Sequence, residues 1–199
     1  MKYDYVVGID EVGRGPVAGP VYVCALMIEA QKLEEFINST GLPLRDSKKL
    51  TEKMRKKWFD KIQEYAKLGF LKYVVSSASS SEIDSKGIAV CIKASAQASV
   101  LKLNLDKEKT KVFLDGGLSV SSDFIQETVI KGDENIPVIS LASIVAKVLR
   151  DEKMEDYAKK YPEYLFEKNK GYGTKAHLDA VKKFGLTELH RKSFLKNYI

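Results

Sequence analysis

The sequence predicts a single α/β domain built from five strands and several helices. Its 199 residues suit one domain with a substantial core. The composition, with 44% hydrophobic and 30% charged residues, is that of an ordinary globular protein and argues against a disordered chain or a membrane protein. Apolar strand-like runs and segments with helical spacing follow one another along the chain, which favours a sheet with packed helices.

Five apolar runs rich in β-branched and aromatic residues are predicted to be strands. The first begins at Tyr5 and is expected to end near Asp10, and the short connection after it predicts an antiparallel neighbour. The expected strands are residues 5–10, 17–28, 70–77, 111–114 and 127–131. The polar residues 132–135, which follow the fifth run, are expected to form a solvated turn.

Helices are expected between these strands. Thr51 is a candidate cap for a helix whose apolar residues, from Met54 to Tyr65, recur at helical spacing. Ser79 and Glu82 have the spacing of a second helix start. The remaining expected helices are residues 33–39, 88–103, 139–160 and 175–184.

The net charge of +6 is compatible with a polyanionic partner. Basic residues cluster at 45–49, 53–57 and 147–192, which predicts a basic rim around an acidic centre. No apolar run approaches the roughly 20 residues that span a bilayer, and an acid stands where a signal peptide needs its apolar segment. A cytoplasmic protein with two buried free thiols, Cys24 and Cys91, is therefore expected.

The motif GIDEVGRGPVAGP holds the first candidate site. Asp10 and Glu11 are expected to carry the chemistry, and the turn Gly13, Arg14 and Gly15 is expected to hold a phosphodiester chain, because glycine allows backbone amides to approach a ligand closely. Adjacent strand residues point to opposite faces, so the two acids are expected to share a site only where the strand breaks down. The alternative is a strand followed by a surface turn with solvated charges.

Two further motifs carry polar residues at the ends of elements. Asp115 ends an apolar strand before two glycines, and it would meet Asp10 if the two strands lie side by side, because ligands gather at the carboxyl ends of strands. The alternative is a turn-initiating aspartate. The segment RDSKKL contains Lys48 and could equally be a solvated loop.

The segment 139–160 has one polar edge, where Ser143, Lys147, Arg150 and Asp151 fall within an arc of about 100°. The alternative for Lys147 and Asp151 is an ordinary i,i+4 ion pair. Beyond it, the basic loop KNKGYGTK presents Tyr172 between glycines, a suitable stacking surface for a sugar or base. A core tyrosine beside a turn is the other interpretation.

Five motifs along the chain resemble, in the same order, those of ribonuclease HII, the type 2 ribonuclease H family. They are DEVGRGP, DSKKL, LDGG, ASIVAKVLRD and KGYGT. Val12, where the family often has alanine, is a minor departure. The resemblance implies a ribonuclease H-like fold with a five-stranded mixed sheet between helices. It also implies one catalytic domain over residues 1–199. Within this domain, residues from roughly 162 to 199 would form a helical segment that completes the substrate groove. The resemblance further implies cleavage of RNA in RNA/DNA hybrids and 5′ of single ribonucleotides in duplex DNA, leaving 3′-hydroxyl and 5′-phosphate ends.

The resemblance assigns roles to individual residues. The four acids that it implies as catalytic metal ligands are Asp10, Glu11, Asp115 and Asp151. The implied substrate contacts are Gly13, Arg14 and Gly15 at the 2′-hydroxyl, Lys48 at a phosphate and Tyr172 against the nucleotide at the RNA to DNA junction. Four carboxylates in one poorly solvated pocket need cations, and hard oxygen ligands favour Mg²⁺ or Mn²⁺ over zinc. Two such ions about 4 Å apart could activate a water and stabilise the leaving oxygen.

Three alternatives remain open at this stage. Ribonuclease HIII normally has an extra N-terminal domain, lysine in place of Arg14 and glutamate as the fourth acid, none of which this sequence shows. A DNA-specific nuclease of the same fold would lack preference for a ribonucleotide, and a non-catalytic binding module would bind without cutting. A monomer is expected, and the ending SFLKNYI gives no clear match to the sliding-clamp peptide that some relatives carry.

Overall fold

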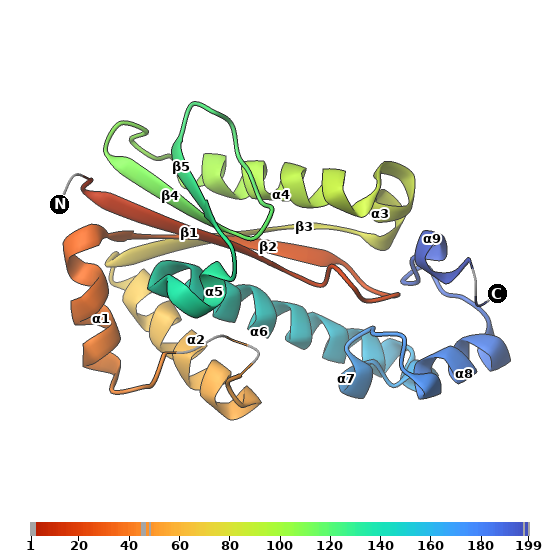
Figure 1. Ribbon diagram of the computed structural model, residues 1–199. Coiled ribbons are helices and arrows are strands. Elements are labelled where there is room, and N and C mark those ends of the chain that lie inside the picture. Colours follow the sequence, from red (N-terminus) through yellow and green to blue (C-terminus); the bar gives the residue numbers. More distant parts are fainter. Residues whose placement is uncertain (1–2, 45–46, 48, 197, 199) are drawn as a thin grey trace.

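The computed structural model describes residues 3–44, 47, 49–196 and 198. Five strands form one mixed sheet in the order β3-β2-β1-β4-β5, with helices on both faces (Figure 1). The strands are β1 Tyr5–Val12, β2 Val21–Glu29, β3 Leu71–Ala78, β4 Thr110–Asp115 and β5 Ile125–Val129. The predicted α/β fold with a five-stranded mixed sheet is thereby confirmed.

The directions of the strands decide which ends meet. β1 pairs antiparallel with β2 and parallel with β4, and β4 pairs parallel with β5. The carboxyl ends of β1, β4 and β5 therefore lie at one edge of the sheet, where polar side chains from distant parts of the chain can gather. Parallel pairing of β1 with β4 ends at Ile9 and Leu114, so Asp10 and Asp115 are the next residues along each strand.

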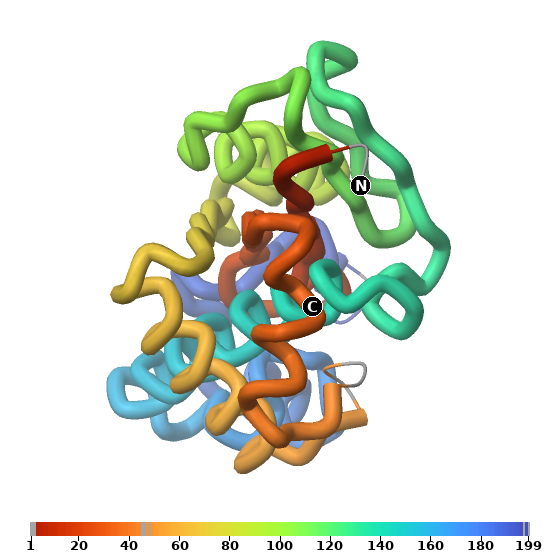
Figure 2. The backbone as a smooth tube through the Cα atoms, turned by 90° about the vertical axis from the view of Figure 1, so that its left-hand side faces the viewer, coloured from red at the N-terminus to blue at the C-terminus, as the bar shows by residue number. Residues whose placement is uncertain are grey.

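The helices form two layers, which the turned view in Figure 2 also shows. Their bounds are α1 Leu33–Thr40, α2 Glu52–Lys67, α3 Ser80–Lys86, α4 Ile88–Lys102, α5 Gly132–Asn135, α6 Pro137–Lys160, α7 Phe166–Asn169, α8 Lys175–Phe184 and α9 Lys192–Leu195, with short 3-10 turns at Ala30–Lys32 and Pro162–Tyr164. One core packs α3 and α4 against the sheet, and a second packs α1, α2 and α6 against its other face. No helix in the described part of the chain combines the length and apolarity that crossing a membrane requires.

Local signals of the sequence explain several of these elements. Thr51 accepts a hydrogen bond from the Met54 amide at 3.2 Å and caps α2, and Ser79 forms a capping box with Glu82 at the start of α3. Both caps confirm the sequence-based expectations. Cys24 and Cys91 are free and buried, also as expected.

Most expected bounds lie within one or two residues of the observed ones, and three differences in strands bear on the site. β1 continues to Val12, because β2 extends its ladder past the acidic pair. β2 starts only at Val21, since residues 13–20 form a separate loop, here called the glycine loop. β5 is Ile125–Val129 rather than 127–131.

Two close approaches fix α6 and the C-terminal segment. A Cβ at Gly8 would lie 2.1 Å from the Val138 carbonyl oxygen, so only glycine lets the start of α6 reach β1. A third apolar cluster packs Ala18 of the glycine loop with Met154 of α6 and Leu189 near the C-terminus. The end of the chain thus folds back onto the loop that follows β1.

Candidate active site

Asp10 lies on β1, opposite Cys24 of β2, with only 3% of its surface exposed. Its Oδ1 accepts a hydrogen bond from the Glu11 amide at 2.7 Å. Burial is the largest influence and raises the pKa of Asp10 to about 8; the charges of Glu11 and Asp115 add to this rise, while a hydrogen bond with Ser143 opposes it. The protein alone therefore does not compensate a negative charge at this position.

Asp115 and Asp133 join Asp10 in one group. The three carboxylates offer oxygens that all lie within 4.8 Å of one another, and we call this group the three-aspartate cluster. Asp115 ends β4, and its Oδ1 accepts a hydrogen bond from the Gly132 amide at 2.6 Å. A Cβ at Gly132 would lie 2.5 Å from the terminal Cδ1 of Ile139 and 3.3 Å from Oδ1 of Asp115, so a side chain there would require Ile139 to shift.

Asp133 corrects the interpretation of residues 132–135 as a solvated turn. These residues form the helical turn α5, and Asp133 is only 4% exposed. The sequence contains a usable signal: Asp133 closely follows the fifth apolar run, just as Asp10 and Asp115 end the first and fourth runs. The signal is weak because Asp133 stands among other polar residues, and its burial depends on the order of strands in the sheet.

Glu11 lies beside the three-aspartate cluster but is not one of its members. Its Oε1 is 3.4 Å from Nη1 of Arg14. Burial raises the pKa of Glu11, the Arg14 guanidinium opposes that rise, and the charge of Asp115 adds to it. The expectation that the strand breaks at Asp10 and Glu11 is wrong, since both residues pair in register with β2.

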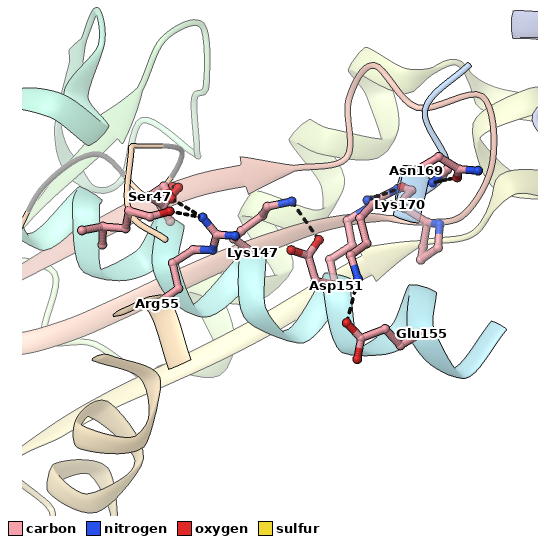
Figure 3. A network of polar contacts seen from close by, with 12 residues as sticks. Ser47, Arg55, Lys147, Asp151, Glu155, Asn169 and Lys170 are labelled. Atoms are coloured by element: carbon pink, nitrogen blue, oxygen red, sulfur yellow. Dashed lines mark hydrogen bonds and ion pairs between the residues drawn. The ribbon is translucent and has the colours of Figure 1, made fainter. Parts of the chain in front are cut away.

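Asp151 lies elsewhere on α6 and is not part of the three-aspartate cluster. Its Oδ1 accepts a hydrogen bond from Nζ of Lys147 at 2.8 Å, and the two side chains meet one helical turn apart (Figure 3). Asp151 also lines a groove between α2 and α6, together with Arg55 and Lys56. This contact is the i,i+4 ion pair that the sequence analysis gave as the alternative for Lys147 and Asp151.

A line of hydroxyl groups connects Asp10 with the segment before α2. Ser143 of α6, which hydrogen-bonds Asp10, lies with its Oγ 2.8 Å from Oγ of Ser47. Arg55 holds the Ser47 carbonyl oxygen at 2.8 Å from Nη1 (Figure 3). Ser47 is thereby anchored at the acidic site. Its neighbour Lys48, an expected phosphate contact, lies outside the described residues.

The glycine loop runs beside the acids, and its two expected contact glycines differ in their surroundings. Gly13 has φ +92°, and a Cβ there would lie 2.2 Å from Nε of Arg150, so packing alone requires glycine. At Gly15 the nearest atom to a Cβ would be Cε1 of Tyr172 at 3.7 Å, an ordinary contact. Packing therefore does not explain the glycine at position 15.

Tyr172 faces Gly15 and keeps 46% of its surface exposed. Its backbone is held at both ends, because its amide donates to the Asn169 carbonyl at 2.9 Å and its carbonyl oxygen lies 2.8 Å from Nδ1 of His177. An exposed ring on a fixed backbone agrees with the stacking interpretation of this loop and not with a core tyrosine.

Solved structures with the same fold were compared with this architecture. Ribonuclease HII of Archaeoglobus fulgidus, solved with PCNA, superposes with a TM-score of 0.74 at 21% identity, covering 94% of this chain and 93% of that one. Ribonuclease H2 of Pyrococcus horikoshii gives 0.70 at 23% identity, with 98% and 96% covered. Bst ribonuclease HIII in complex with Mn²⁺ gives 0.69 at 16% identity, with 100% and 71% covered. The chain thus has the fold of ribonucleases HII and HIII.

Sequence comparisons narrow this class to one family. The family model for ribonuclease HII matches residues 7–197. Ribonuclease HII of Clostridium perfringens is 45% identical over 197 residues, which are 99% of this chain and 69% of that protein, and ribonuclease HII of Coxiella burnetii is 39% identical over 189 residues, which are 95% and 87%. The chain belongs to the ribonuclease HII family, and it is a ribonuclease H enzyme.

Proposed function

We propose that this enzyme hydrolyses the RNA strand of RNA/DNA hybrids and cuts duplex DNA on the 5′ side of single embedded ribonucleotides, leaving 3′-hydroxyl and 5′-phosphate ends. The observation that carries the proposal is the three-aspartate cluster beside the glycine loop, in a chain of the ribonuclease HII family. The cluster offers acidic oxygens for phosphodiester hydrolysis, and the loop offers a surface for the strand that is cut. Action as a cytoplasmic monomer, expected from the sequence, remains a prediction.

The cluster fits a hard divalent cation, and Mg²⁺ or Mn²⁺ is proposed as the cofactor. All its donors are carboxylate oxygens, which these ions prefer. Burial and neighbouring negative charges raise the pKa of Asp10. A cation bound beside Asp10 would lower that pKa and stabilise the carboxylate. Divalent cations bound there would activate a water and stabilise the charge that develops on the phosphate and the leaving oxygen.

We propose that Asp133, rather than Asp151, completes the metal-binding acids with Asp10 and Asp115. Two observations support this proposal. Asp133 belongs to the three-aspartate cluster, whose oxygens lie within 4.8 Å of one another, whereas Asp151 forms an ion pair with Lys147. Glu11 lies close enough for its pKa to respond to Asp115, so it is proposed as the fourth acid at the edge of the cluster. Asp151 would then hold Lys147 beside the groove instead of binding metal.

The protein's own groups orient these acids. The Glu11 amide donates to Asp10, and the Gly132 amide donates to Asp115, so each carboxylate has one oxygen fixed by the backbone. Arg14 partly balances the charge of Glu11 at 3.4 Å. A fixed set of ligands needs little rearrangement when substrate arrives.

Substrate recognition is proposed for Gly13, Arg14, Gly15, Lys48 and Tyr172. The open space at Gly15 and the exposed ring of Tyr172 support contact with the sugar of the ribonucleotide, whose 2′-hydroxyl is the group that DNA lacks. For Lys48 the proposal rests on its motif alone. The ribonuclease HII of Archaeoglobus fulgidus forms a complex with PCNA, and no sliding-clamp contact is proposed for this chain.

The test is cleavage of a DNA duplex that contains one ribonucleotide, beside an all-DNA duplex of the same sequence, with Mg²⁺, with Mn²⁺ and with a chelator. Metal-dependent cutting on the 5′ side of the ribonucleotide, with the control intact, is expected. Equal cutting of both duplexes would instead indicate a DNA nuclease. Binding of both duplexes without cutting, also of a long hybrid, would indicate a non-catalytic module.

A further inference from the structure

Arg191 connects the end of the chain with the glycine loop. Its side chain is fully buried, and all three of its guanidinium nitrogens donate to backbone carbonyl oxygens of that loop. Nη2 donates to Gly13 at 2.6 Å, Nη1 to Arg14 at 3.1 Å and Nε to Gly19 at 2.9 Å. One side chain therefore sets the orientation of several loop peptides.

This orientation has a consequence for two amides. In a planar trans peptide the carbonyl of one residue and the N–H of the next point in opposite directions. Because Arg191 binds the carbonyl oxygens of Gly13 and Arg14, the N–H groups of Arg14 and Gly15 point away from it. Within the described part of the chain neither N–H has a hydrogen-bond partner. Two adjacent free amides form a site for an oxygen atom with negative or partial negative charge.

Arg150 of α6 also binds the glycine loop and serves as a comparison with Arg191. It is equally buried and also donates to three carbonyl oxygens, those of Pro20 at 2.9 Å, Lys170 at 2.9 Å and Ala18 at 3.3 Å. The peptides that it binds carry no free amide of this kind. The N–H after Ala18 donates to Leu189, the N–H after Lys170 donates to Asn169, and the peptide after Pro20 enters β2.

We propose that Arg191 is a positioning residue for substrate: it turns the amides of Arg14 and Gly15 outward so that they bind a phosphate or hydroxyl oxygen of the ribonucleotide strand. This inference rests on the function proposed above. Among the described residues no carboxylate forms an ion pair with either buried arginine, although the charge of Asp84 acts on Arg191 and that of Asp151 acts on Arg150. Two arginines behind the loop favour an anion in front of it. Burial, and after it the charge of Arg150, lowers the pKa of Arg191 to about 10, which leaves it cationic at neutral pH.

The test compares Arg191→Lys with the matched control Arg150→Lys. Lysine keeps the charge but lacks the planar fork that binds three fixed carbonyls, so both variants lose the same kind of hydrogen bond. We would measure the melting temperature and, in chelator, the ratio of the affinity (1/Kd) for the single-ribonucleotide duplex to that for the all-DNA duplex. Both variants are expected to melt at lower temperature, whereas the ratio falls about tenfold or more only in Arg191→Lys, the effect of losing one or two oriented hydrogen bonds.

An unchanged ratio in a folded Arg191→Lys, or an equal fall of the ratio in both variants, would overturn the inference while the proposed function stands. A parent protein that cuts both duplexes equally would overturn the proposed function and the inference with it.

If Arg191→Lys does not fold, amide NMR of the parent protein tests the same inference. The single-ribonucleotide duplex, added in chelator, is expected to shift the Arg14 and Gly15 amide protons downfield more than that of Gly19, which already donates to Leu189. Equal shifts at all three would contradict the assignment.

Discussion

Asp115 ends β4, Asp133 lies in α5 just beyond the neighbouring parallel strand β5, and their carboxylate oxygens lie within 4.8 Å of one another. The Gly132 amide, one residue before Asp133, holds Asp115 at 2.6 Å. Together with Asp10 on β1, these acids make the edge of the sheet, and not the helix α6, the source of the proposed metal site. This arrangement leads to predictions that separate groups binding ligand from groups maintaining the fold.

Replacement of the two loop glycines by alanine is expected to have opposite effects. Gly15→Ala adds a Cβ with no close neighbour at a position without positive φ, so the free energy of unfolding should change by less than about 0.5 kcal/mol. Cleavage of the single-ribonucleotide duplex should nevertheless fall, because the new methyl group would occupy space left for the sugar. Denaturant unfolding and kcat/KM on that duplex measure the two effects.

The partner variant Gly13→Ala should unfold more easily, by about 1–3 kcal/mol, because alanine must adopt φ +92° and meet Arg150. Because Gly13 is itself a proposed substrate contact, the comparison between the two variants rests on the loss of stability, which Gly15→Ala should not share. Parent-level cleavage by Gly15→Ala would contradict a substrate contact at that glycine.

Removal of the Tyr172 ring should reduce substrate affinity without unfolding the loop, since the backbone of Tyr172 is held by Asn169 and His177. Tyr172→Ala is expected to raise KM on the single-ribonucleotide duplex by an amount equivalent to about 1–3 kcal/mol of stacking. Tyr172→Phe should retain most of the affinity. Phe184→Ala, which removes another exposed ring on α8, is the control, and an equal loss in that variant would argue against a specific contact.

Two buried histidines predict a loss of stability in mild acid. His177 and His190 face each other with their Nε2 atoms 3.1 Å apart. Burial, and after it the charge of His177, lowers the pKa of His190 to about 4, and burial also lowers the pKa of His177. In the unfolded chain both return to about 6.5.

Between pH 6.5 and 4 the two histidines bind more protons in the unfolded chain than in the folded protein, so their contribution to the free energy of unfolding should fall as the pH falls through this window. The raised pKa of Asp10 contributes in the opposite direction, so the effect of the histidines is read from the difference between the parent protein and a histidine variant. For His190 the decrease is on the order of 2 kcal/mol. Urea unfolding of the parent protein and of His190→Gln at a series of pH values measures it, and the stability advantage of the parent should shrink as the pH falls from 6.5 to 4. A constant difference between the two proteins across this window would contradict the buried neutral pair.

The sequence predicted the elements whose signals are local. Thr51 and Ser79 cap their helices as expected, and Lys175 and Phe184 bound α8 as predicted. The meeting of Asp10 and Asp115 could be inferred as well, because each acid follows an apolar strand run and the two strands lie side by side, although β1 continues to Val12.

Features that depend on contacts between distant segments could not be predicted from the sequence. Asp133 is buried because β5 lies next to β4, a neighbourhood that no local pattern encodes. Arg150 was placed on a polar edge, but the loop after β1 and the C-terminal segment enclose it completely. A buried arginine without a carboxylate is uncommon, and only the folded backbone supplies its carbonyl partners.

The measurement that tests the central claim most directly is single-turnover cleavage of the single-ribonucleotide duplex by Asp133→Asn and Asp151→Asn, with Mg²⁺ and with Mn²⁺. Both changes remove one charge with little change of shape. Asp133→Asn should slow cleavage more than about 100-fold with either ion, because it removes a ligand that supports several kcal/mol of charge stabilisation. Asp151→Asn breaks an ion pair with Lys147 and should cost no more than about tenfold. Near-normal cleavage by Asp133→Asn, with none by Asp151→Asn, would contradict the three-aspartate cluster as the metal site.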